Sequence, residues 1–122
     1  MWLDLAQEDL KICDILLHEG ALPRGICFHA QQVAEKYLKG YIAYQNKNIR
    51  KVHDLEELLQ ECVSYDPEFN ELKEVTVFLN GFYEKTRYPG DMRALSIHDA
   101  ERAFASAQKI KDFVMKKIKE NE

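Results

Sequence analysis

Apolar residues recur along most of the chain at steps of three and four residues, the spacing that gathers side chains on one face of an α-helix. Before Gly20 the apolar face is formed by Leu3, Ala6, Leu10, Cys13 and Leu17. Pro23 suits the first turn of a second helix, where its missing N–H costs nothing, and the pattern continues without a breaker to about Tyr44. The sequence predicts a first helix that ends at Gly20 and a longer second helix over residues 23–44.

Two more helices have clear start signals. Asp54 can accept hydrogen bonds from the free N–H groups of a helix that begins after it, and Glu57 stands three residues on, as in a capping box. Asp66, followed by proline, repeats the signal, and the proline and glycine at 89–90 end the helix that it starts. The apolar faces of these two helices are Leu55, Leu58, Leu59 and Cys62, and Leu72, Val75, Leu79 and Phe82.

A last helix is predicted from Ser96, with Asp99 three residues later, and it turns Ala103, Ala107, Ile110 and Val114 inward. The stretch 87–95 before it is turn-rich, and loops of this kind often carry binding residues. Alternation at period two is not sustained anywhere, so no strand is predicted. The pattern therefore predicts an all-α fold, with a single domain over residues 1–122 built as a bundle of four or five amphipathic helices.

The composition fits a globular protein, because 46% apolar and 31% charged residues support a packed core with a solvated surface. The formal net charge of −4 does not indicate a general nucleic-acid coating protein, although a local basic stripe could still meet a phosphate. No apolar run approaches the roughly 20 residues of a membrane helix, and no signal-peptide pattern opens the chain. We expect a cytoplasmic protein with no membrane association.

Three cysteines, Cys13, Cys27 and Cys62, lie far apart at core-like helical positions. No two of them have the close spacing of a zinc or redox pair. We expect reduced thiols in the core, and neither a metal nor a cofactor.

The second helix carries a polar stripe beside its apolar face, formed by His29, Gln32, Lys36 and Lys39. At about 100° per residue the four side chains fall in an arc of about 80°, next to but outside the apolar arc. Two ammonium groups and an imidazole along one line could bind phosphate or another subunit. The alternative interpretation is an ordinary solvated helix face with His29 at its edge.

A second candidate site combines Arg93 with His98, which follows after four intervening residues. Metal-independent RNA cleavage can use an imidazole for proton transfer beside an arginine that stabilises developing phosphate charge. The alternative is that both are exposed residues without a catalytic role.

Three motifs resemble those of the HEPN family, whose name abbreviates "higher eukaryotes and prokaryotes nucleotide-binding". The first is the segment 29–40, which reads HAQQVAEKYLKG. The second is His53-Asp54-Leu55 at the start of the third helix, and the third is Thr86-Arg87-Tyr88-Pro89 at the end of the fourth. They occur in the family's order and span most of the chain.

The resemblance implies an up-and-down four-helix bundle with an additional short helix, commonly dimeric. In prokaryotes such a chain is often encoded beside a small nucleotidyltransferase, in some cases as a toxin and antitoxin pair. We also expect a symmetric homodimer because apolar and aromatic residues such as Phe78, Phe82, Tyr83 and Phe104 exceed what a thin bundle can comfortably bury.

In RNase-active members an arginine and a histidine, with four to six residues between them, converge across the dimer to cut RNA without metal, often with a tyrosine two places after the histidine. Arg93 and His98 meet this spacing, but Ala100 stands where the tyrosine would be. In a second alignment Arg87 is the family arginine, Met92 and Arg93 occupy the range of the histidine, and the pair is broken. We favour the second alignment.

Two hypotheses follow. The favoured one is a non-catalytic homodimer that binds a nucleotide or nucleic-acid phosphate, or docks a small nucleotidyltransferase, through the polar stripe, His53 and Arg87. The alternative is a metal-independent endoribonuclease that uses Arg93 and His98.

Overall fold

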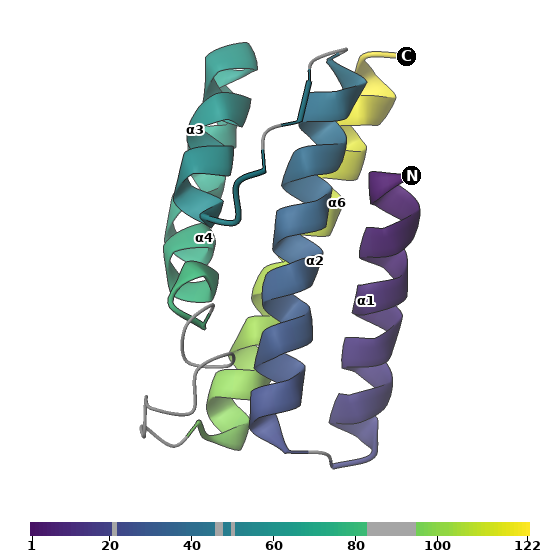
Figure 1. The fold of residues 1–122 in the computed structure, drawn as a ribbon, viewed down its shortest axis with the longest axis vertical. Coiled ribbons are helices and arrows are strands. Elements are labelled where there is room, and N and C mark those ends of the chain that lie inside the picture. Colours follow the sequence, from purple (N-terminus) through teal and green to yellow (C-terminus); the bar gives the residue numbers. More distant parts are fainter. Residues whose placement is uncertain (21, 46–47, 50, 83–94) are drawn as a thin grey trace.

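The fold is an antiparallel arrangement of helices (Figure 1). The computed structural model describes residues 1–20, 22–45, 48–49, 51–82 and 95–122. Its elements are α1 (Trp2–His18), α2 (Pro23–Tyr44), α3 (Leu55–Tyr65), the 3-10 helix η1 (Pro67–Leu72), α4 (Lys73–Asn80) and α6 (Ile97–Glu120), and no strand occurs among the described residues. Helices α1, α2, α4 and α6 alternate in direction, while α3 lies beside α4 (Figure 1). The predicted all-α fold is confirmed.

Side-chain caps fix the helix starts where the sequence placed them. The Asp54 carboxylate accepts hydrogen bonds from the backbone N–H groups of Glu56 and Glu57, at 2.9 and 3.1 Å. Ser96 and Asp99 form a reciprocal capping box, in which each side chain accepts from the other's backbone N–H. These groups satisfy donors that the first turn of a helix leaves without an intrahelical acceptor.

The fourth predicted helix begins differently from the expectation. Asp66 does cap a helical segment, but that segment is η1, and α-helical geometry starts only at Lys73. In a 3-10 helix, residues three apart lie on the same face. This period places Phe69 and Leu72 together in the core, where both are completely buried. The predicted end of this helix, at 88–90, lies outside the described residues.

Helix α2 occupies the centre of the bundle, in contact with α1, α3, α4 and α6. Tyr37 and Tyr41 are among its largest buried side chains, and the Tyr41 ring packs on Phe69 of η1 with 4.4 Å between centroids. Gly40 lets α1 approach closely, because a Cβ at this position would lie 2.5 Å from Cδ2 of Leu3. A helix surrounded in this way has few positions left at which a polar side chain can reach solvent.

The three cysteines are free and buried, as predicted, and burial raises the pKa of the Cys13 and Cys27 thiols to about 12. Tyr44, the last residue of α2, is 40% exposed. Its place near the end of α2 lets its hydroxyl donate to the backbone carbonyl of Ile118 in α6, at 3.5 Å.

The aromatic residues that suggested a surplus of apolar surface are less exposed than expected. Phe82 belongs to the core, Phe78 and Phe104 pack against the core while staying partly exposed, and Tyr83 lies outside the described residues. None of the described helices is both long and apolar enough to span a membrane.

Candidate functional site

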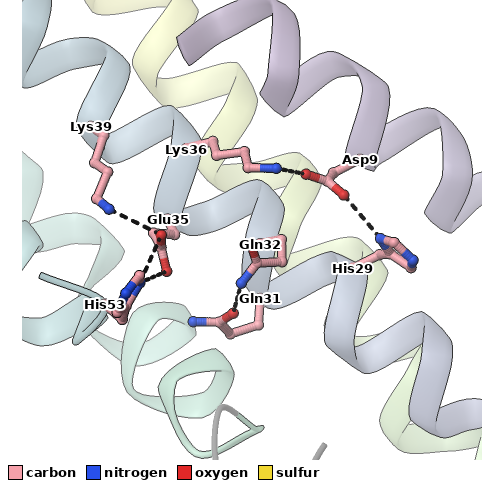
Figure 2. Close-up of polar contacts among 8 residues, drawn as sticks. All are labelled: Asp9, His29, Gln31, Gln32, Glu35, Lys36, Lys39 and His53. Carbon is pink, nitrogen blue, oxygen red and sulfur yellow. Dashed lines mark hydrogen bonds and ion pairs between the residues drawn. The ribbon is translucent and has the colours of Figure 1, made fainter. Parts of the chain in front are cut away.

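The polar stripe lies on α2, with Asp9 of α1 on one flank of the helix and His53, from the segment that enters α3, on the other (Figure 2). Two carboxylates that the sequence analysis did not single out, Asp9 of α1 and Glu35 of α2, organise these residues. Arg87 and Arg93 lie outside the described residues.

Asp9 binds two residues of the stripe at once. One carboxylate oxygen is 2.9 Å from Nδ1 of His29, and the other accepts a hydrogen bond from Nζ of Lys36. The Asp9 side chain is 10% exposed, whereas those of His29 and Lys36 are 25% and 21% exposed. Since a carboxylate in a mostly buried position needs partners to offset its lost hydration, Asp9 holds both side chains in fixed positions against α1.

Glu35 forms the second cluster, together with Lys39 and His53. Its carboxylate accepts a hydrogen bond from Nζ of Lys39 at 3.0 Å and lies 3.2 Å from Nδ1 of His53. The Lys39 ammonium also lies 5.1 Å from the centre of the Trp2 ring, a cation–π distance. Glu35 and Lys39 are both about 4% exposed, so this ion pair belongs to the interior of the bundle.

Between the clusters, two adjacent glutamines bond to each other. Nε2 of Gln32 donates to Oε1 of Gln31 at 2.7 Å. Gln31 is 1% exposed, and its own Nε2 has no hydrogen-bond acceptor among the described residues. In Figure 2 this nitrogen points away from α1, toward the side of α2 where His53 lies. Buried amide donors are rarely left without an acceptor, so the Nε2 of Gln31 is a group whose partner could come from a ligand.

The alternative interpretation of the polar stripe, an ordinary solvated helix face, is wrong for Lys39, which is 4% exposed, while His29, Gln32 and Lys36 are partly exposed. A helical arc places residues only relative to their own helix, whereas in the fold α1 covers one flank of the stripe and the segment before α3 the other (Figure 2). A signal for Asp9 was present, because it falls between Ala6 and Cys13 on the buried face of α1. Glu35 stands four residues before Lys39, the spacing of a helical ion pair.

Of the second candidate pair, Arg93 and His98, only His98 lies among the described residues. His98 lies in the first turn of α6 with its side chain 90% exposed, and its Nδ1 is 3.6 Å from a carboxylate oxygen of Glu101. Arg93 lies outside the described residues, so the geometry of the pair stays untested.

The site offers several hydrogen-bonding groups to an outside ligand. Lys36 donates to Asp9 from an ammonium that carries three donors, and the His29 contact uses only one of its two ring nitrogens. Among the described residues no group of three His, Cys, Asp or Glu side chains is arranged to hold a metal ion.

Comparison with solved structures shows two close similarities over nearly the whole chain. TT1696 from Thermus thermophilus is 32% identical, with a TM-score of 0.78, over 95% of this chain and 94% of that one. ST0689, described as an archaeal HEPN homologue, is 27% identical with a TM-score of 0.75, over 96% of this chain and 94% of that one. Among curated proteins none matches the sequence significantly. The HEPN domain matches residues 1–118, and the chain therefore belongs to the HEPN domain family.

Proposed function

We propose that this protein is a non-catalytic binding module that acts as a homodimer and binds a nucleotide or a nucleic-acid phosphate. The observation that carries the proposal is the donor set on α2, in which Asp9 fixes His29 and Lys36 beside the amide pair of Gln31 and Gln32. Donors that are held in place before the ligand arrives lose little conformational freedom on binding.

The groups suit a ligand that has both an anionic and a polar neutral part. The ammonium of Lys36 and the imidazole of His29 are donors for phosphate oxygens. The amide nitrogen of Gln32 donates to Gln31. The side-chain carbonyl oxygen of Gln32 is then an acceptor for the N–H of a base or the hydroxyl of a sugar. Nε2 of Gln31, which has no acceptor among the described residues, adds one buried donor. In this proposal Lys39 and His53 support the site through Glu35, and Arg87 is a further phosphate contact.

Calorimetric titration with ADP tests the proposal, with Gln32→Glu as the variant and Gln7→Glu as its matched control. Both substitutions add one negative charge at nearly constant shape, but Gln7 lies on the exposed side of α1 and is not part of the site. Carboxylate in place of the Gln32 amide should repel phosphate and weaken binding at least tenfold, equivalent to about 1.4 kcal/mol. An equal loss in both variants, or no binding by the wild type to ADP or to a short single-stranded RNA, would refute the proposal.

We further propose, on the family resemblance, that a small nucleotidyltransferase is the protein partner and that both act in the cytoplasm. Co-expression with such an enzyme from the neighbouring reading frame, followed by gel filtration, should give one complex. If the two proteins elute separately at micromolar concentration, this partner is wrong.

The endoribonuclease hypothesis makes the opposite prediction for RNA. A module without catalytic activity should leave RNA intact in the presence of a chelator between about pH 5 and 8, the range where an ordinary histidine changes charge. Cleavage that survives chelation and disappears in His98→Ala would replace the binding module by the nuclease.

A further inference from the structure

A groove between α1 and α6, here called the α1–α6 groove, lies apart from the candidate site. Both helices pack mainly on α2 and only lightly on each other. The groove that remains between them has a volume of about 430 Å³ and is lined by Gln7, Leu10, Lys11 and Asp14 of α1 and by Phe104, Gln108 and Lys111 of α6. It shares no residue with the polar stripe and is therefore a separate surface.

The lining residues recur with helical periodicity on both walls. On α1 they follow one another at steps of three, one and three residues, and on α6 at steps of four and three. Each wall thus spans seven residues, which is about two turns or 10 Å of an α-helix. A straight channel between two antiparallel helices accepts the side-chain ridge of a third helix.

The floor of the groove is apolar and its edges are polar. Leu10 and Phe104 pack against the hydrophobic core and stay partly exposed. Gln7 and Gln108 are exposed, one on each wall. An apolar centre within a polar rim is the arrangement found in protein–protein interfaces.

The two ammonium groups of the groove, one on each wall, are unpaired. Among the described residues no ion pair or side-chain hydrogen bond involves Lys11 or Lys111, although Lys111 is partly buried. Both lysines of the polar stripe, in contrast, bind a carboxylate. The carboxylate of Asp14 also lines the groove, but it lies 3.2 Å from Nδ1 of His18. Lys11 and Lys111 are therefore available to carboxylates from outside the chain.

We propose that the α1–α6 groove docks an acidic amphipathic helix of a partner protein. Apolar side chains of such a helix, at steps of three and four residues, cover Leu10 and Phe104. Carboxylates beside this apolar face pair with Lys11 and Lys111 in charge-assisted hydrogen bonds. A short acidic helix needs no more than these two cations to match its charge.

Charge also argues against a nucleic acid as the occupant. Binding of a long polyanion depends on many phosphate contacts, whereas the groove offers two lysines and also contains Asp14. The formal net charge of −4 adds a repulsion that grows with the charge of the partner. The inference goes beyond the proposed function and does not depend on it, because the nucleotide and the partner helix occupy different surfaces.

Fluorescence anisotropy with two labelled peptides tests the proposal. Both peptides are alanine-based, about 20 residues long so that they are helical in water, and carry leucines at steps of three and four residues. One has glutamates on both sides of the leucines, and the other has lysines at the same positions. The wild-type protein should bind the glutamate peptide at least about tenfold more tightly. In NMR spectra this peptide should shift the side-chain amide signals of Gln7 and Gln108.

Two double variants of equal charge locate the contact. Lys11→Glu with Lys111→Glu should weaken binding of the glutamate peptide about 100-fold or more and make the lysine peptide the better ligand. Lys109→Glu with Lys116→Glu is the matched control, because both residues are exposed on α6 and neither lines the groove. The control should bind both peptides as the wild type does.

Three results would overturn the proposal: no binding of the glutamate peptide by the wild type, equal affinities for the two peptides, or equal losses in the two double variants. ADP titration separates this proposal from the nucleotide site. Since the two double variants carry the same net charge and leave the polar stripe intact, they should bind ADP equally well. A failed nucleotide site and a failed docking groove therefore give different results.

Discussion

The polar stripe of α2 and the groove between η1, α4 and α6, here the α4–α6 groove, both contain acidic and basic side chains. In the stripe these side chains form ion pairs, and in the groove they form none with a described residue. In the stripe, Lys36 binds Asp9 and Lys39 binds Glu35, and the two carboxylates are at most a tenth exposed. In the groove, Arg102 stacks on an aromatic ring, and neither it nor its carboxylate neighbours form an ion pair with a described residue. Acidic and basic side chains therefore form ion pairs of low exposure in the stripe, whereas in the groove they face solvent.

The difference separates charged residues that contribute to the stability of the fold from charged residues that are available for binding. A buried ion pair is costly to break, because removal of one partner leaves a charge in a place with little water. Unpaired exposed charges contribute little to stability and are available for an interface. Substitutions of the same type in the two regions should consequently have very different effects on the free energy of unfolding.

The largest effect is expected from Glu35→Gln. It would leave the Lys39 ammonium, whose side chain is 5% exposed, without a carboxylate, and should lower the free energy of unfolding by about 3 kcal/mol. The matched change in the groove, Glu71→Gln, should stay within about 0.5 kcal/mol. Urea denaturation of both variants measures the difference, and two equally small effects would contradict the contrast between the regions.

Next in size is the effect of Gly40→Ala, which tests how closely α1 packs on α2. Its Cβ would meet Cδ2 of Leu3 at 2.5 Å, so Leu3 or the helix must shift, at a cost of about 1 kcal/mol. Gly25→Ala in the same helix places its Cβ 3.8 Å from the nearest side-chain atom and should be neutral or stabilising. Thermal melts compare them, and equal melting temperatures would show that the approach of α1 is not tight.

A smaller, pH-dependent effect is expected at the far end of α6. The Lys117 ammonium, 2.9 Å from the Asp66 carboxylate, donates the hydrogen bond that lowers the pKa of Asp66. In the acid range the unfolded chain then binds more protons at Asp66 than the folded one, so stability is lost as pH falls below the ordinary Asp pKa of about 4 toward the lower pKa of the folded chain. In Lys117→Met this part of the acid dependence should disappear. An unchanged dependence of unfolding on pH below about 5 would rule out the pair as its source.

Local features of the sequence predicted the helices well, because a cap such as Asp54 or Ser96 acts within its own first turn. The apolar stripe of α6 was equally predictable, and its four inward residues are all buried. The division of the fourth helix into η1 and α4 was missed, since it depends on how Phe69 fits between α2 and α6.

The candidate site could be predicted only in part. The residues of the polar stripe were found from helical periodicity, but Asp9 pairs with Lys36 across 27 positions of sequence, and no local rule links them. The Lys39–Glu35 pair is contacted by Trp2, which lies beside Lys39, and by His53, which lies beside Glu35, and these two residues come from two other segments. Pairings of this kind are set by tertiary packing, which periodicity within a single helix does not record.

The most direct test of the ligand site is an NMR titration with ADP that follows the side-chain amide signals of the glutamines and asparagines. Gln31 and Gln32 lie in the proposed site, whereas Asn70 lines the α4–α6 groove and Gln108 lies exposed on α6. We predict that the Gln31 and Gln32 signals shift as ADP is added while those of Asn70 and Gln108 stay in place. Unchanged Gln31 and Gln32 signals at saturating ADP, or shifts confined to Asn70, would contradict the account.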